Sequence, residues 1–266
     1  MGLKYLAIIC IVAAVLCSVG FYKYVYFLSI GYGFAIAGGG ITILAISLTQ
    51  GWNSELLWLL VTQAVLFFLY GFRLSGFLLV REIKNAAYRK TLKEATGDDK
   101  KIPFFVSFSI WVFVAILYTM QVSPMFYRYY NGSKDIVVPL VGIVISTLGL
   151  LLESLADKQK SAQKKENPNM VATKGLYRIV RCPNYLGEII FWTGVTISGI
   201  TTYKGAFQWA LAIIAYISIV YIMFNGAQRL EKRQMGRYGN DKEYKEYADH
   251  TPIIIPFLPI YHLNKQ

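Results

Sequence analysis

Seven long apolar stretches dominate this chain of 266 residues. A helix needs about 20 mainly apolar residues to cross the hydrocarbon core of a bilayer. Only 16% of the residues are charged, whereas soluble domains carry about a quarter. The sequence therefore predicts an all-α integral membrane protein with seven transmembrane helices, which we place at residues 4–22, 30–49, 55–80, 103–123, 136–155, 184–203 and 205–225.

Lysine and arginine are distributed unevenly between the loops that join these stretches. If alternate loops lie on one side, that side holds 22 basic residues and the other holds four, namely Lys4, Arg128, Lys134 and Lys204. The positive-inside rule then predicts an outer N-terminus and a cytoplasmic C-terminus. The net charge of +12 is explained by membrane orientation and anionic cofactors, so we expect no nucleic acid partner.

The chain shows no internal repeat, low-complexity stretch or long linker, which predicts a single membrane domain over residues 1–266. Its three cysteines have neither disulfide-framework nor zinc-site spacing, and neither histidine has a metal-ligand partner at useful spacing, so we expect no metal. P-loop, GxGxxG and hydrolase-triad motifs are absent from the sequence. We expect a multi-pass monomer surrounded by membrane lipid, in a bacterial inner membrane.

Two polar residues, Tyr70 and Arg73, interrupt the third apolar stretch. Their i, i+3 spacing places them on one helix face. A tyrosine hydroxyl beside a cation can donate a strong hydrogen bond to a carbonyl oxygen, which makes the pair a candidate catalytic site. The alternative is an interfacial tyrosine with an arginine that reaches the inner surface, and the pattern alone favours that alternative.

Polar residues also gather at the cytoplasmic ends of the fifth and sixth stretches. Glu153 and Asp157 are four residues apart, and their carboxylates could accept hydrogen bonds from an amide or from ribose hydroxyls. The alternative is a helix end that enters water. Farther along the chain, Asn184 and Glu188 stand four residues apart at the start of a helix.

Basic residues flank that helix start and follow the last stretch. Arg178 and Arg181 precede the helix, and a helix N-terminus with arginines before it favours an anion. Arg229 and Arg233, at i, i+4, could hold phosphates. The alternatives are positive-inside arginines at a capped membrane helix and a basic helix that lies against anionic lipid.

The segment Gly175–Trp192 and the tail, with Tyr244, Tyr247 and Ile255-Pro-Phe257, resemble the C-terminal half of the steroid 5α-reductase family. The closest resemblance is to a bacterial, DUF1295-like branch of membrane oxidoreductase-like proteins. Sterol reductases and isoprenylcysteine carboxyl methyltransferases are more distant. The resemblance is clear from about residue 153 to residue 257 and thinner from residue 70 to residue 81.

The resemblance implies seven helices that enclose NADPH on the cytoplasmic side and admit a lipophilic enone from the bilayer. Residues 1–80 then form the substrate side, and residues 136–259 form the cofactor-binding half. Tyr70, with Arg73, corresponds to the tyrosine that hydrogen-bonds the substrate carbonyl. The implied cofactor-binding residues are Glu153, Asp157, Arg178, Arg181, Asn184, Glu188, Arg229, Arg233, Tyr244 and Tyr247.

The chain departs from the family pattern in two places. The reductases pair their tyrosine with an earlier glutamate, but no acidic residue precedes Glu55 here, which leaves Gln50 or Gln63 as substitutes. The methyltransferase relatives usually have Arg-His-Pro and paired glutamates where this chain has Arg181-Cys-Pro183 and Glu231-Lys232. The missing acid counts against a steroid as the substrate. The two differences from the methyltransferases favour reduction over the alternative, S-adenosylmethionine-dependent methylation of a membrane thiol or amine. A non-enzymatic lipid-binding or transport protein is a third possibility.

Overall fold

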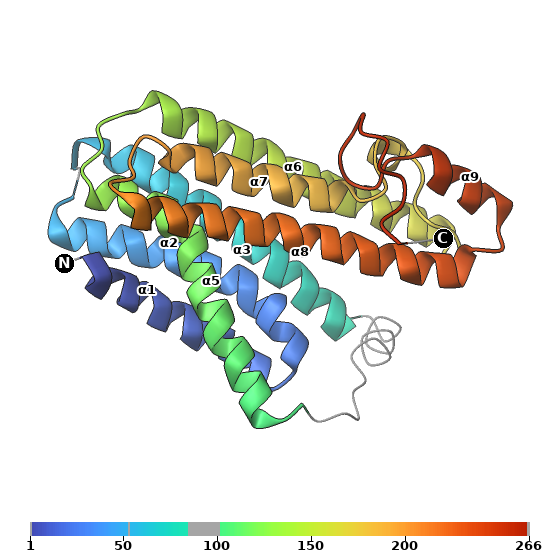
Figure 1. Ribbon diagram of the computed structural model, residues 1–266, viewed down its shortest axis with the longest axis horizontal. Helices are drawn as coiled ribbons and strands as arrows, with labels where there is room; N and C mark the ends of the chain where they lie inside the picture. Colours follow the sequence, from blue (N-terminus) through green and yellow to red (C-terminus); the bar gives the residue numbers. More distant parts are fainter. Residues whose placement is uncertain (1, 53, 85–101, 265–266) are drawn as a thin grey trace. The chain divides into compact units, whose positions relative to one another are not determined.

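The computed structural model describes residues 2–52, 54–84 and 102–264. All regular elements in these ranges are helical (Figure 1). They are α1 (Gly2–Cys17), η1 (Ser18–Phe21), η2 (Tyr24–Leu28), α2 (Ile30–Gln50), η3 (Ser54–Leu56), α3 (Leu57–Lys84), α5 (Phe104–Tyr130), α6 (Val137–Glu166), η4 (Gly175–Arg178), α7 (Pro183–Gly199), α8 (Ala206–Tyr238) and α9 (Lys242–His250).

The described chain is all-helical, as predicted. Six of its helical segments are long and apolar enough to cross a membrane. They are Gly2–Phe21, Ile30–Gln50, Leu57–Lys84, Phe104–Tyr130, Val137–Glu166 and Ala206–Tyr238. The remaining expected span corresponds to α7, whose 17 residues are shorter than a typical span. The count of seven spans and the orientation of the termini stay predictions.

Several helices continue past the apolar stretches that predicted them. α6 extends to Glu166 and α8 to Tyr238, in each case through a charged last segment. Hydropathy marks where a chain leaves the bilayer, but backbone hydrogen bonding can continue the helix into water. The described chain forms two compact units: residues 1–140 with 196–215, and residues 141–195 with 216–266.

In the first unit, α2 packs against α1, α3 and α5. Its contact with α3 is a backbone-to-backbone approach, since a Cβ on Gly71 would lie 2.1 Å from the carbonyl oxygen of Gly33. Small residues allow membrane helices to approach this closely. Ser75 seals the contact by donating its hydroxyl to the carbonyl of Ile30 at 2.6 Å.

In the second unit, α6 and α7 approach each other in the same way. A Cβ on Gly149 would lie 2.6 Å from the carbonyl oxygen of Gly187, and a Cβ on Gly187 would lie 2.6 Å from Cγ of Glu153. Any larger residue at these positions would separate the helices. The two glycines therefore hold the acidic end of α6 against the first turns of α7.

The C-terminal tail folds back onto the same unit after α9. The backbone N–H groups of Arg181 and Cys182 donate to the carbonyls of Pro252 and Ile253, each at 2.8 Å. Ile253 and Ile254 are buried together with Cys182 and Ala227. This apolar contact holds the tail against the start of α7 and against α8 at Ala227.

Candidate functional site

Two carboxylates are buried where α6 meets α7. Glu153 is 2% exposed and Glu188 is 5% exposed. Glu188 accepts a hydrogen bond from Nε1 of Trp192 at 3.0 Å. Asp157 lies one turn beyond Glu153 and is partly exposed. Carboxylates in such surroundings are costly, which marks this junction of helices as a candidate site.

Tyr185 shows how residues from three helices converge beside this junction. Its ring packs against Gly226 of α8, where an added Cβ would lie 3.3 Å away. Burial dominates the environment of its hydroxyl, and the charges of Arg233, Arg229 and Asp157 also act on it. The second unit therefore brings the predicted acidic residue of α6 and the two predicted arginines of α8 within electrostatic range of one tyrosine.

Sequence reasoning missed Tyr185, although it directly follows Asn184. An aromatic residue at the edge of a membrane span carries no signal of its own. Asn184 itself is partly exposed in the first turn of α7, and Arg178 is exposed on η4. Both stay candidate cofactor contacts, since the described structure assigns them no competing partner.

Arg181 has a structural role that the sequence did not predict. It is 4% exposed, and its Nη2 donates to Oε1 of Glu231 at 2.7 Å and to the carbonyl of Tyr261. Glu231 also accepts the backbone N–H groups of Leu263 and Asn264 at 2.9 and 3.1 Å. Arg181 thus joins α8 to the tail, and its expected contact with a cofactor stays a prediction.

Cys182, next to this ion pair, has an unreactive thiol. Burial raises the pKa of its thiol to about 12, against which the nearby charge of Arg181 has a smaller effect. The thiolate is the nucleophilic form of cysteine, so a thiol that stays protonated at neutral pH is a poor nucleophile.

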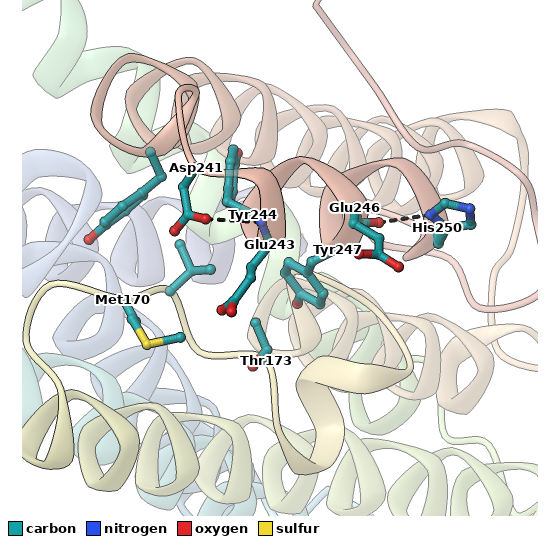
Figure 2. A pocket seen from close by; sticks show the side chains of 10 residues that line it. Met170, Thr173, Asp241, Glu243, Tyr244, Glu246, Tyr247 and His250 are labelled. Carbon is teal, nitrogen blue, oxygen red and sulfur yellow. Dashed lines mark hydrogen bonds between the residues drawn. The ribbon is translucent and has the colours of Figure 1, made fainter.

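A cavity of about 410 Å³ lies between α9 and the segment at residues 170–173. Figure 2 shows its lining side chains, of which Glu243 and Tyr247 extend from α9 toward the segment that carries Thr173. Two of the predicted cofactor residues, Tyr244 and Tyr247, belong to the lining. The full set is Met170, Val171, Thr173, Tyr238, Asp241, Glu243, Tyr244, Glu246, Tyr247 and His250.

Two tyrosines connect the cavity to the backbone of α6 at Ala156, the residue before Asp157. The hydroxyl of Tyr247 donates to the carbonyl of Tyr177 at 2.6 Å, and the hydroxyl of Tyr177 donates to the carbonyl of Ala156 at 3.3 Å. Burial raises the pKa of both hydroxyls, so both remain donors at neutral pH. The cavity is therefore joined to α6 at the turn that contains Asp157.

The predicted catalytic residues belong to the first unit. Tyr70 is fully buried, and its hydroxyl donates to the hydroxyl of Tyr32 at 2.8 Å, because the close approach of α2 and α3 places Tyr32 beside it. Arg73 is partly exposed. The two glutamines that could replace the missing acid have other hydrogen bonds: Gln63 accepts from Tyr129 at 3.0 Å, and Gln50 accepts from Tyr5 at 2.7 Å.

Glu231→Gln is expected to loosen the tail, since it removes the charge that Arg181 and the backbone of Leu263 and Asn264 share. Hydrogen bonds to a charged group contribute about 1.5–3 kcal/mol each. Hydrogen–deuterium exchange of residues 252–264 should therefore accelerate by at least about tenfold. Glu166→Gln, at the exposed end of α6, is the control. Unchanged exchange in the Glu231 variant would refute this role of the ion pair.

Comparison with known proteins gives a family and two distant relatives. The family described as "Protein of unknown function (DUF1295)" matches residues 34–251. Steroid 5-alpha-reductase DET2 of Gossypium hirsutum is 25% identical over 122 residues, which cover 45% of this chain and 42% of that protein. The Arabidopsis thaliana protein of the same name is 23% identical over 122 residues, or 45% and 41%. The chain thus spans less than half the length of these relatives. No solved structure matches it.

Proposed function

This chain belongs to the DUF1295 family, and on that premise we propose that it reduces an activated C=C bond of a lipophilic enone within the membrane. The partial similarity to steroid 5-alpha-reductases supports this reaction. A 3-oxo-Δ4 steroid is a representative substrate. The proposed architecture has seven spans, an outer N-terminus and a cytoplasmic C-terminus, and the proposed location is a bacterial inner membrane.

The observation that best supports the proposal is that Asp157, Arg229 and Arg233, from two helices, all lie within electrostatic range of Tyr185. Guanidinium groups bind the oxygens of a diphosphate, and carboxylates accept hydrogen bonds from ribose hydroxyls and from a carboxamide. This donor set fits a nicotinamide dinucleotide, which the resemblance predicts to be NADPH. When bound, such a nucleotide supplies the hydride.

Each group of the protein has a separate task in the proposed reaction. Arg229 and Arg233 bind the diphosphate, while Asn184 and Glu188 orient the nicotinamide. Glu188 is held for that task by its hydrogen bond from Trp192. When substrate is bound, Tyr32 donates to the Tyr70 hydroxyl instead of accepting from it. Tyr70 then donates its proton in a hydrogen bond to the carbonyl oxygen of the substrate as negative charge develops there. Such a bond is stronger in a water-poor site than in water.

Thermal unfolding of the purified protein tests the choice of cofactor. A nicotinamide dinucleotide at 100 times its dissociation constant should stabilise the folded state by about 2.7 kcal/mol, whereas S-adenosylmethionine should not. An Arg229→Ala, Arg233→Ala double variant should lose most of this stabilisation. If S-adenosylmethionine stabilises the folded protein and neither NADPH nor NADH does, methyl transfer replaces reduction as the proposed function. Glu231, which stands where the methyltransferase relatives have the first of paired glutamates, already binds Arg181.

A further inference from the structure

The lining of the cavity beside α9 is acidic. Asp241, Glu243 and Glu246 contribute carboxylates, and none of the ten lining residues is a lysine or an arginine. The side chain of Glu243 extends from α9 toward Thr173 on the facing segment (Figure 2). All three acidic residues are exposed. A ligand in the cavity would therefore contact acidic side chains and no lysine or arginine of the lining.

Cations flank the cavity, but no ion pair of the described residues holds the two glutamates of its lining. Asp241 uses Oδ1 to accept the N–H of Glu243 at 2.9 Å, as the N-cap of α9. The ion pairs found among the described residues involve neither Glu243 nor Glu246. Both carboxylates can therefore accept hydrogen bonds from a ligand, and both would repel an anionic group.

The rest of the lining suits a flat, neutral ring system. Tyr238, Tyr244 and Tyr247 supply aromatic rings, and the centroids of the Tyr238 and Tyr244 rings are 5.9 Å apart. Aromatic faces attract the face or edge of another ring. The volume, about 410 Å³, is within the range of pockets that hold a small molecule. A nucleoside has the required parts: a base to stack and ribose hydroxyls to donate.

The cations of this region lie along α8 and end at the edge of the cavity. Arg229, Arg233 and Arg237 recur every fourth residue, so they follow one face of the helix for about 12 Å. The Arg237 guanidinium lies 5.3 Å from the centre of the Tyr238 ring, which lines the cavity. Lys164, which donates to the Tyr238 hydroxyl at 3.1 Å, also binds the carbonyls of Pro168 and Met170.

We propose that this cavity binds the adenosine end of an unphosphorylated dinucleotide, and that NADH rather than NADPH is the preferred donor. The inference rests on the proposed function and changes the nucleotide that the family resemblance implies. The diphosphate lies along the arginines of α8, and the 2′-hydroxyl of the adenosine ribose donates to Glu243 or Glu246. Dinucleotide sites commonly read that hydroxyl with an acidic residue and the 2′-phosphate with an arginine. A 2′-phosphate here would meet three carboxylates, and like charges in contact oppose binding strongly.

The test is nucleotide binding by the purified full chain, measured by calorimetry and by thermal unfolding. We expect the dissociation constant of NADH to be at least about tenfold lower than that of NADPH, a difference of about 1.4 kcal/mol. A Glu243→Arg, Glu246→Arg double variant should reverse the preference. The melting temperature without nucleotide shows whether this variant folds, which its exposed positions favour.

Glu166→Arg is the matched control, because it reverses an exposed charge outside the cavity. It should leave the ratio of the two dissociation constants unchanged. Tighter binding of NADPH, or an unchanged ratio in the folded double variant, would overturn the inference while the proposed function stands. Binding of neither dinucleotide would overturn both.

Discussion

Replacing Tyr70 with phenylalanine is expected to lower the turnover of a lipophilic enone by about 10²–10³-fold, the usual effect of removing one hydrogen-bond donor to a developing oxyanion. The KM should change little, because the donor acts mainly on charge that develops in the transition state. The Tyr70 ring is fully buried, so the variant keeps its packing and loses only the hydroxyl and its bond to Tyr32. The measurement is anaerobic nucleotide oxidation in detergent or liposomes with a panel of enones.

Two matched variants separate catalysis from structure. Tyr221→Phe removes a hydroxyl from a tyrosine that is 68% exposed on α8, and it should retain full turnover. Tyr32→Phe leaves the Tyr70 hydroxyl in place but removes its hydrogen-bond partner at 2.8 Å. The turnover of this variant should therefore lie between those of Tyr70→Phe and Tyr221→Phe. Undiminished turnover in the Tyr70 variant would remove this residue from the mechanism.

Arg128→Met is expected to lower the free energy of unfolding by about 3–5 kcal/mol, as removing one partner of a buried polar cluster does. Arg128 is fully buried. Its guanidinium donates to the carbonyl of Ser198 at 2.6 and 3.0 Å and to the carbonyl of Asp135 at 2.8 Å. Methionine fills similar space but leaves these acceptors without a donor. The melting temperature in detergent reports the loss.

Lys134→Met is the control for Arg128. Lys134 pairs with Glu55 at 3.5 Å, and both side chains are more than three quarters exposed. An exposed pair contributes about 0–1 kcal/mol, so its loss should barely change the melting temperature. Equal melting temperatures for the two variants would show that the Arg128 cluster is not a major source of stability.

Arg128 also shows where sequence reasoning stops. The sequence predicts that Arg128 lies in an outer loop, because the apolar stretch before it ends near residue 123. In the structure it lies within α5 (Phe104–Tyr130) and is buried. Hydropathy cannot distinguish a loop arginine from one whose N–H groups bond to acceptors that include the Ser198 carbonyl and the Thr201 hydroxyl, 70 and 73 residues later.

Arg181 gives the same lesson within the candidate site. Its place before a helix start predicted an anion contact, yet the ion pair with Glu231 depends on a residue 50 positions later. Tyr32, the partner of Tyr70, is 38 residues distant in sequence and follows no spacing rule. The acidic cavity likewise depends on how α9 faces residues 170–173.

The sequence by itself determined the helical class, the approximate place of each apolar stretch and the residue types that could serve a nucleotide. These follow from hydropathy and helical spacing, which are local properties of the chain. Only the tertiary structure decided which polar groups meet, because a partner for a buried charge or hydroxyl is chosen by the approach of distant segments. Glycine contacts such as Gly33 with Gly71 and Gly149 with Gly187 set that approach, and they become visible only once the helices are packed.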